Sequence, residues 1–164
     1  MKRIILHWTV GTYQPNKHEF DCYHYLINGD GLVIKGRYQP EDNLDCKDGK
    51  YAQHCGGGNT GSIGIALCGM CGYKDRQHLG PYPLKRIQYE KAYELMAQLC
   101  HKYNIPITKT TVLTHMEFGN QHPSTTSHGK IDVSIATYDM KIQPAAMGNH
   151  IREKVNWYYK KNEV

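Results

Sequence analysis

The sequence predicts a single α/β (α+β) domain with a central mixed β-sheet flanked by helices. Three observations favour this class: short apolar segments with strand character fill much of the first half, a long amphipathic segment follows, and a second helical segment lies near the end. The length of 164 residues fits one ordinary domain. We therefore expect residues 1–164 to form one folding unit.

The first half reads as strands joined by turns. Residues 3–7 form an apolar strand, and residues 23–27 and 32–35 flank turn-forming residues in the manner of a β-hairpin. Residues 38–60 are polar and rich in Asp, Gly and Asn, which predicts a long surface loop. Residues 62–68 are apolar or small at every position, as expected of a strand that is buried on both faces.

The second half contains two helical patterns and one strand. Apolar residues recur at three- and four-residue intervals over residues 84–103, which predicts an amphipathic helix ended by Asn104 and Pro106. Residues 111–114 read as a strand that leads into a histidine, and residues 149–160 read as a final helix. Strands mixed with two long helices imply an α/β or α+β domain with a central mixed sheet.

Charge and hydropathy restrict the partners. A net charge of +5 and a pI near 8.8 favour association with an anionic polymer. Lys and Arg are scattered singly and no helix carries a basic stripe, so we expect no nucleic-acid partner. No apolar run approaches the roughly 20 residues of a membrane span. We therefore expect no transmembrane segment.

The six cysteines are expected to be free thiols, because the chain is longer than a typical disulfide scaffold and shows no export signal. Cys68 and Cys71 have the spacing of half a structural zinc site, but no second Cys-x-x-Cys pair completes it. A separate structural zinc is therefore not expected.

Two histidines stand at the ends of predicted strands. His7 follows an apolar strand, and His115 follows residues 111–114. A catalytic zinc ion takes three protein ligands of the His, Cys or carboxylate type and leaves a further position open. Each histidine alone is weak evidence, because a single histidine is more often a surface residue or a satisfied buried one.

Five motifs in chain order make the histidines more informative. They are IILHWT at residues 4–9, YHYLI with GDG and GR at residues 23–37, AQH with NTGSIGI at residues 52–65, LTH at residues 113–115 and GKID at residues 129–132. Together they resemble the zinc-dependent N-acetylmuramoyl-L-alanine amidases, the family that includes phage amidase-type lysozymes and peptidoglycan recognition proteins. The resemblance runs from His7 to about Ser134.

The resemblance implies a function and a metal site. It implies hydrolysis of the amide between N-acetylmuramic acid and L-alanine in bacterial peptidoglycan, with one Zn²⁺ held by His7, His115 and Asp132. Zinc in such a ligand set activates water and polarises a carbonyl. Lys130 is implied as the group that stabilises the oxyanion, and in an extended segment its side chain would point the same way as that of Asp132. Tyr23 is implied as a second catalytic residue that acts mainly by orientation.

The resemblance also implies a substrate groove lined by His54, Asn59 and Thr60 on the loop before the buried strand. One departure concerns the general base, since Ala66 stands where some relatives carry a glutamate. Glu117 lies close to His115 in sequence, but its direction is open at this stage.

Two further departures flank the implied ligands. Residues 117–128 are longer than in compact phage enzymes and could form a loop over the cleft, although His122 and His128 are better read as solvent-facing. Val133 occupies a position at which many relatives have proline.

Alternatives to the enzyme remain open. Some proteins of this fold bind peptidoglycan without cutting it, and a phage lysozyme of the family also inhibits its phage's RNA polymerase. The basic first residues precede an apolar stretch that is too short for a signal peptide. We therefore expect synthesis in the cytoplasm and action on the cell wall after release or export, as in a phage or prophage endolysin that depends on a holin.

Overall fold

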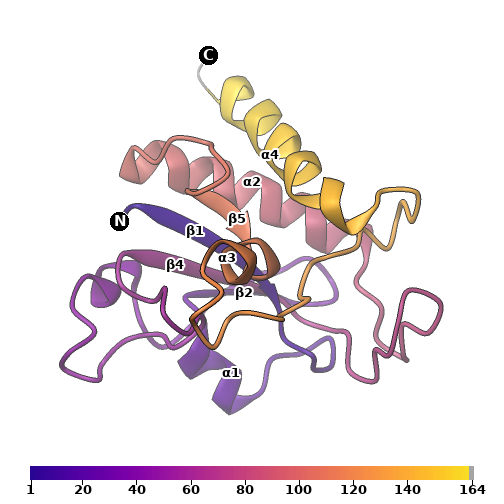
Figure 1. Ribbon diagram of the computed structural model, residues 1–164, viewed down its shortest axis with the longest axis horizontal. Helices are drawn as coiled ribbons and strands as arrows, with labels where there is room; N and C mark the ends of the chain where they lie inside the picture. The colour runs from indigo at the N-terminus through magenta and orange to yellow at the C-terminus, as the bar shows by residue number, and fades with distance from the viewer. Residues whose placement is uncertain (163–164) are drawn as a thin grey trace.

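The computed structural model describes residues 1–162, and Figure 1 shows the arrangement of their helices and strands. The elements, in chain order, are β1 (Arg3–Trp8), α1 (Lys17–Cys22), β2 (Tyr25–Ile27), β3 (Val33–Lys35), the 3-10 helix η1 (Pro40–Leu44), β4 (Ser62–Leu67), α2 (Arg86–Tyr103), β5 (Val112–Thr114), α3 (His115–Gln121) and α4 (Pro144–Lys161). Within these residues, no helix is both long and apolar enough to span a bilayer.

The five strands form one mixed sheet in the order β3-β2-β4-β1-β5, which confirms the predicted architecture. β1 runs parallel to its neighbours β4 and β5, and β2 runs parallel to β4. β3 is antiparallel to β2, as the predicted hairpin requires. Every residue of β4 is buried, which confirms the strand expected to be covered on both faces.

Alternation along β1 separates the main core from the site. Ile4, Leu6 and Trp8 join the large apolar cluster that also contains buried residues of α2 and α4. Ile5 belongs instead to a small apolar cluster that is separate from that core. Because successive side chains of a strand point to opposite faces, His7 lies on the same face as Ile5. The site is therefore built on the face opposite the main helical core.

The two long helices lie together on the sheet, as Figure 1 shows for α2 and α4. α2 is followed by its C-cap residue Asn104, which adopts the left-handed conformation typical of this position. α4 begins at Pro144, five residues before the predicted start, because proline fits the first turn of a helix. The large buried side chains Tyr89 and Tyr93 of α2 fill the core beneath these helices.

Two short α-helices, and the 3-10 helix η1 within the predicted loop 38–60, were not predicted. α1 has six residues and is capped by Asn16, whose side chain accepts a hydrogen bond from the amide of Glu19. α3 follows β5 directly, because Thr114 and Glu117 form a capping box that turns the chain from strand to helix at His115. The segment 117–128, expected to be a loop, is therefore helical as far as Gln121, and irregular backbone begins only after that residue.

Candidate metal centre and cleft

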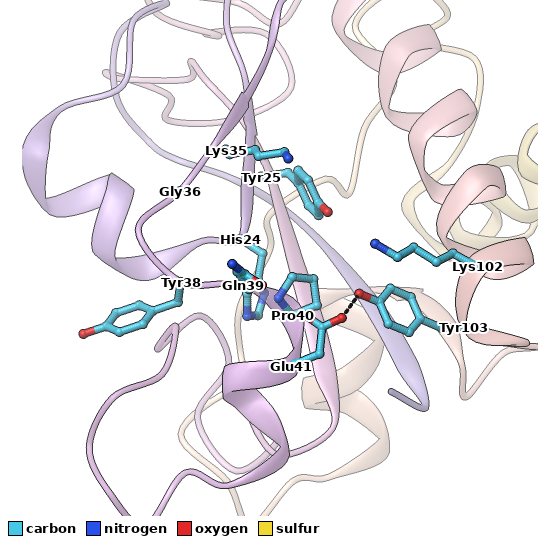
Figure 2. A pocket seen from close by; sticks show the side chains of 10 residues that line it. All are labelled: His24, Tyr25, Lys35, Gly36, Tyr38, Gln39, Pro40, Glu41, Lys102 and Tyr103. Atoms are coloured by element: carbon cyan, nitrogen blue, oxygen red, sulfur yellow. Dashed lines mark hydrogen bonds between the residues drawn. The ribbon is translucent and has the colours of Figure 1, made fainter.

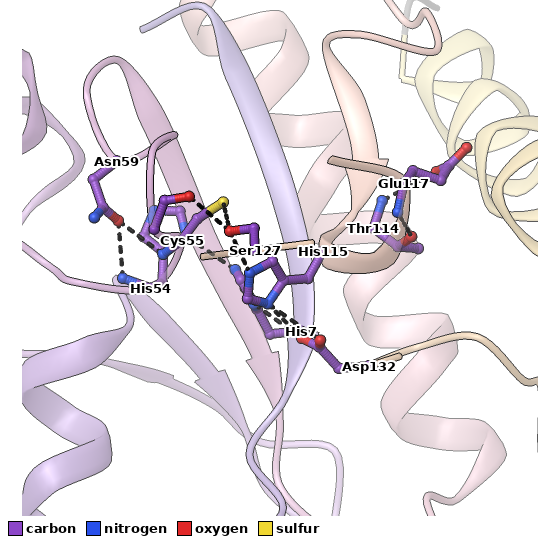
Figure 3. A network of polar contacts seen from close by, with 10 residues as sticks. His7, His54, Cys55, Asn59, Thr114, His115, Glu117, Ser127 and Asp132 are labelled. Carbon is purple, nitrogen blue, oxygen red and sulfur yellow. Dashed lines mark hydrogen bonds and ion pairs between the residues drawn. The ribbon is translucent and has the colours of Figure 1, made fainter. Parts of the chain in front are cut away.

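Three predicted ligands meet at one end of the sheet. His7, near the end of β1, His115, the first residue of α3, and Asp132, in a turn, place their donor atoms within 4.8 Å of one another. All three residues are buried. Figure 3 shows the two imidazole rings and the carboxylate converging from separate segments of the chain.

We call these three residues the metal group. Both histidines turn the same ring nitrogen, Nδ1, toward each other and toward the carboxylate. The Nδ1 atoms of His7 and His115 are 3.1 Å apart. Asp132 Oδ2 lies 3.0 Å from Nδ1 of His7 and 3.2 Å from Nδ1 of His115. Two imidazole nitrogens and a carboxylate oxygen are a donor set typical of catalytic zinc. The residues present therefore fit a zinc ion.

Burial and mutual contacts shift the pKa values of all three residues of the metal group. Burial lowers the pKa of His7 to about 4, and a hydrogen bond to Asp132 offsets only part of this effect. Burial also lowers the pKa of His115, but contacts with Asp132 and Cys55 outweigh it and raise that pKa to about 9. Burial raises the pKa of Asp132, yet its two histidine partners hold it well below its usual range. The carboxylate is thus ionised, and positive charge stabilises it.

Each histidine of the metal group is held through its second ring nitrogen. Nε2 of His7 lies 2.9 Å from Nδ1 of His54, whose own Nε2 is 3.2 Å from the carbonyl oxygen of Ser62. Nε2 of His115 lies 3.0 Å from Oγ of Ser127, which donates to the carbonyl of Gly56 at 2.7 Å. Such contacts fix the ring orientation and tautomer of a metal ligand.

Two glycines permit these contacts. A Cβ atom on Gly64 of β4 would lie 2.5 Å from the ring of His54, and a Cβ atom on Gly56 would lie 1.8 Å from Oγ1 of Thr126. The first distance explains how the ring of His54 approaches β4 closely enough to contact His7. The second explains how the segment that carries Ser127 approaches the loop before β4.

The metal group borders a cleft of about 320 Å³, which we call the metal cleft. Its lining residues are Trp8, Thr9, Val10, Tyr23, His54, His115, Gly129, Lys130, Ile131 and Asp132. Tyr23 places its ring centroid 5.3 Å from that of His7. Lys130 is exposed at the cleft, on the segment that leads into Asp132. The structure therefore brings both implied catalytic residues to the metal group.

The expected extended segment around Asp132 is instead a turn. Asp132 and Val133 lie in the turn, and Val133 has a φ of 61° in the left-handed region. Val133 is fully buried, so packing holds this conformation. Lys130 and Asp132 thus line the same cleft because the chain turns there, rather than because of strand alternation.

The three residues expected in the substrate groove are placed differently from one another. His54 is buried and lines the metal cleft, where it also contacts His7. Oδ1 of Asn59 accepts hydrogen bonds from the amides of His54 and Cys55, so it shapes the loop. Thr60 is exposed, and neither it nor Asn59 lines the metal cleft.

The structure shows in which direction the side chain of Glu117 points. Its carboxylate receives two hydrogen bonds from the guanidinium of Arg152, at 3.0 and 2.9 Å, and one from the amide of Thr114 at 3.1 Å. Glu117 therefore joins α3 to α4 and does not line the metal cleft. Ala66 pairs with His7 in the sheet register and supplies no carboxylate on that face.

His122 and His128 lie away from the metal cleft. Both histidines are exposed, as expected, and His122 also packs on Phe118 with ring centroids 4.2 Å apart. Ser127 was missed by the sequence reasoning. No motif marks it, because its role depends on a fold that brings residues 56 and 127 together. The run of three glycines at residues 56–58 was the available signal that another segment approaches closely there.

Comparison with known proteins identifies the class. The family model described as N-acetylmuramoyl-L-alanine amidase matches residues 1–140. Among solved structures, PlyL is similar with 20% identity and a TM-score of 0.52, covering 94% of this chain and 82% of that one. The E90A mutant of PlyL gives 22% identity, a TM-score of 0.51 and coverage of 94% and 84%.

The amidase LysC from Clostridium intestinale URNW gives 20% identity, a TM-score of 0.49 and coverage of 76% and 75%. No curated protein matches significantly. The fold is similar to that of PlyL. The chain belongs to the N-acetylmuramoyl-L-alanine amidase family.

Proposed function

We propose that this protein is a zinc-dependent N-acetylmuramoyl-L-alanine amidase. It hydrolyses the amide between the lactyl group of N-acetylmuramic acid and the L-alanine of the stem peptide. The observation that supports this proposal is the convergence of His7, His115 and Asp132 beside a cleft that also holds Tyr23 and Lys130. Zinc held by such a set supplies an activated water near neutral pH and polarises the amide carbonyl.

Lys130 and Tyr23 have complementary tasks at the amide. Lys130 places a positive charge on the exposed side of the metal cleft, where it stabilises the oxyanion that forms on the carbonyl oxygen. Burial, and then the charge of Asp132, raise the pKa of Tyr23 well above its usual value. Its hydroxyl therefore stays protonated at neutral pH and orients the reacting groups by donating a hydrogen bond.

His54 and Ser127 act on the ligands rather than on the substrate. Because each contacts the second ring nitrogen of one histidine ligand, each holds an Nδ1 atom toward Asp132. They are positioning residues in this proposal. His54 also lines the metal cleft, so contact with bound peptidoglycan is compatible with this role.

The test is digestion of purified peptidoglycan by the zinc-loaded protein, followed by assay of released amines and mass spectrometry of the products. We expect new amino termini on L-alanine, no loss of glycan linkages, and zinc in the active protein. His115→Ala should abolish release, and Lys130→Ala should reduce it by roughly 10²- to 10³-fold. Lys102→Ala, a lysine outside the metal cleft, is the matched control and should keep full activity.

A second candidate function is binding to peptidoglycan without cleavage. Ala66 favours it, because the face of β4 beside His7 lacks the carboxylate found in some relatives. Sedimentation with cell walls and no amine release from the zinc-loaded protein would support this candidate. Full activity of His115→Ala would refute the metal assignment itself. In cells, the proposed enzyme is a phage or prophage endolysin that acts on the wall after release or export.

A further inference from the structure

Two exposed apolar side chains flank the metal cleft without a role in the proposed chemistry. Val10 is 59% exposed and Ile131 is 49% exposed, and both line the cleft. Val10 follows β1, whereas Ile131 lies between Lys130 and Asp132. They therefore come from the two segments that also bring His7 and Asp132 to the metal group.

Val10 has a backbone conformation that its side chain opposes. Its φ is 58°, in the left-handed region, where a β-branched residue is a true outlier. The neighbouring peptides are fixed, since the amide of Thr9 donates to Leu67 O and that of Gly11 donates to Gly69 O, each at 3.0 Å. Glycine would adopt this conformation freely, so the exposed valine side chain adds strain with little gain in packing.

Local strain of this kind is characteristic of binding and catalytic sites, where the surrounding structure maintains it. Oγ1 of Thr9 reinforces the turn, because it accepts hydrogen bonds from the amides of Gly11 and Gly69, both at 3.1 Å. The result is a rigid support that holds the two methyl groups of Val10 at the cleft. Ile131 is likewise held by the turn that supplies Asp132.

The scissile amide of the proposed substrate carries a methyl-bearing carbon on each side, one in the lactyl group and one in L-alanine. We propose that Val10 and Ile131 form an apolar clamp that contacts these methyl groups and selects an aliphatic residue at the first stem-peptide position. This inference rests on the proposed function and deepens it. The clamp explains why apolar side chains stand exposed beside an otherwise polar metal group.

The test compares two synthetic muramyl peptides that differ only in having L-alanine or glycine after the lactyl group. Loss of one buried methyl group changes kcat/KM by roughly 10-fold or more. We expect the wild-type protein to prefer the L-alanine substrate by about that factor. Val10→Gly and Ile131→Ser should each reduce the preference, mainly by raising KM for the L-alanine substrate. Their zinc content should remain that of the wild type.

Matched variants separate the clamp from general damage to the fold. Val10→Gly relieves the left-handed strain, so its thermal midpoint should equal or exceed that of the wild type. Leu44→Ser removes an apolar side chain that is 58% exposed but lies outside the metal cleft, and should leave the preference unchanged. Wild-type KM and preference in both Val10→Gly and Ile131→Ser would overturn the proposal.

Calorimetric titration keeps this test separate from the test of catalysis. If the zinc-loaded protein cleaves neither peptide, the amidase proposal fails, and dissociation constants for the two intact peptides still report on the clamp. A tighter constant for the L-alanine peptide that disappears in Val10→Gly would support it. Equal constants in the wild type, or no binding of either peptide, would refute it.

Discussion

Two pockets of this protein contain the same kinds of side chain, but only in one of them do the donor atoms of these side chains meet at one point. The metal cleft contains histidine, tyrosine, lysine and a carboxylate. A second pocket of about 200 Å³, which we call the β2–β3 pocket, contains the same four types and is shown in Figure 2. Its lining residues are His24, Tyr25, Lys35, Gly36, Tyr38, Gln39, Pro40, Glu41, Lys102 and Tyr103.

The difference lies in which polar atoms are already occupied. In the β2–β3 pocket, Nδ1 of His24 accepts from the amide of Gly64 and Nε2 faces Oδ1 of Asn43, both at 2.9 Å. The carboxylate of Glu41 accepts from the hydroxyl of Tyr103, as the dashed line in Figure 2 shows. In the metal cleft, by contrast, two Nδ1 atoms and a carboxylate face one another. Convergent donor atoms, rather than residue types, define the candidate metal site.

Metal removal should produce the largest contrast between the two pockets. Zinc at 100 times its dissociation constant should stabilise the wild-type protein by about 2.7 kcal/mol. For a chain of this length, that corresponds to a rise in thermal midpoint of roughly 5 to 10 °C. Asp132→Ala should lose this rise, whereas Glu41→Gln in the β2–β3 pocket should keep it. Calorimetry with and without chelator measures the effect, and an equal rise in Asp132→Ala would contradict the ligand assignment.

Removal of a contact behind a ligand should have a smaller effect. Ser127→Ala leaves Nε2 of His115 without its 3.0 Å partner, and we expect a 10- to 100-fold weaker affinity for zinc. His54→Gln should weaken affinity over the same range, because it changes the contact behind His7. Competition with a chromogenic chelator measures both. Tyr38→Phe in the β2–β3 pocket is the control, and an affinity in Ser127→Ala equal to that of the control would exclude a positioning role for Ser127.

His24 of the β2–β3 pocket should make the stability of the protein depend on pH. Burial lowers its pKa to about 4 despite the opposing contact with Asn43. The unfolded chain therefore binds a proton that the folded protein excludes between pH 6.5 and about 4, and stability falls as pH falls through this window. His24 contributes up to about 3 kcal/mol to this loss.

His24→Gln removes this titration, so the stability of its zinc-free form should depend less steeply on pH from 6.5 to 4 than that of the zinc-free wild type. Denaturant unfolding at several pH values measures the slope. His128→Gln, at an exposed position, is the matched control and should keep the wild-type slope. A slope in His24→Gln identical to that of the wild type would contradict the assignment.

Local patterns explain why much of the fold could be predicted. Alternation and turn residues indicated the hairpin of β2 and β3, and the apolar run at residues 62–68 indicated a central strand. Helix periodicity placed α2 within two residues of its observed start, and the capping residues ended it. α3 was not predicted although Thr114 and Glu117 carry its capping box, because the strand pattern of residues 111–114 runs directly into His115 and masks this local signal.

The sequence by itself determined the order of the strands and of the two long helices, the family motifs and the identity of the three candidate ligands. Only the tertiary structure decided that Glu117 pairs with Arg152, that Asn59 shapes a loop and that Ser127 supports His115. The physical reason is that periodicity and capping act over a few residues, whereas these contacts join segments far apart in the chain. A motif can indicate which residue is a candidate ligand, but packing decides which of its atoms remain free to contact a metal ion.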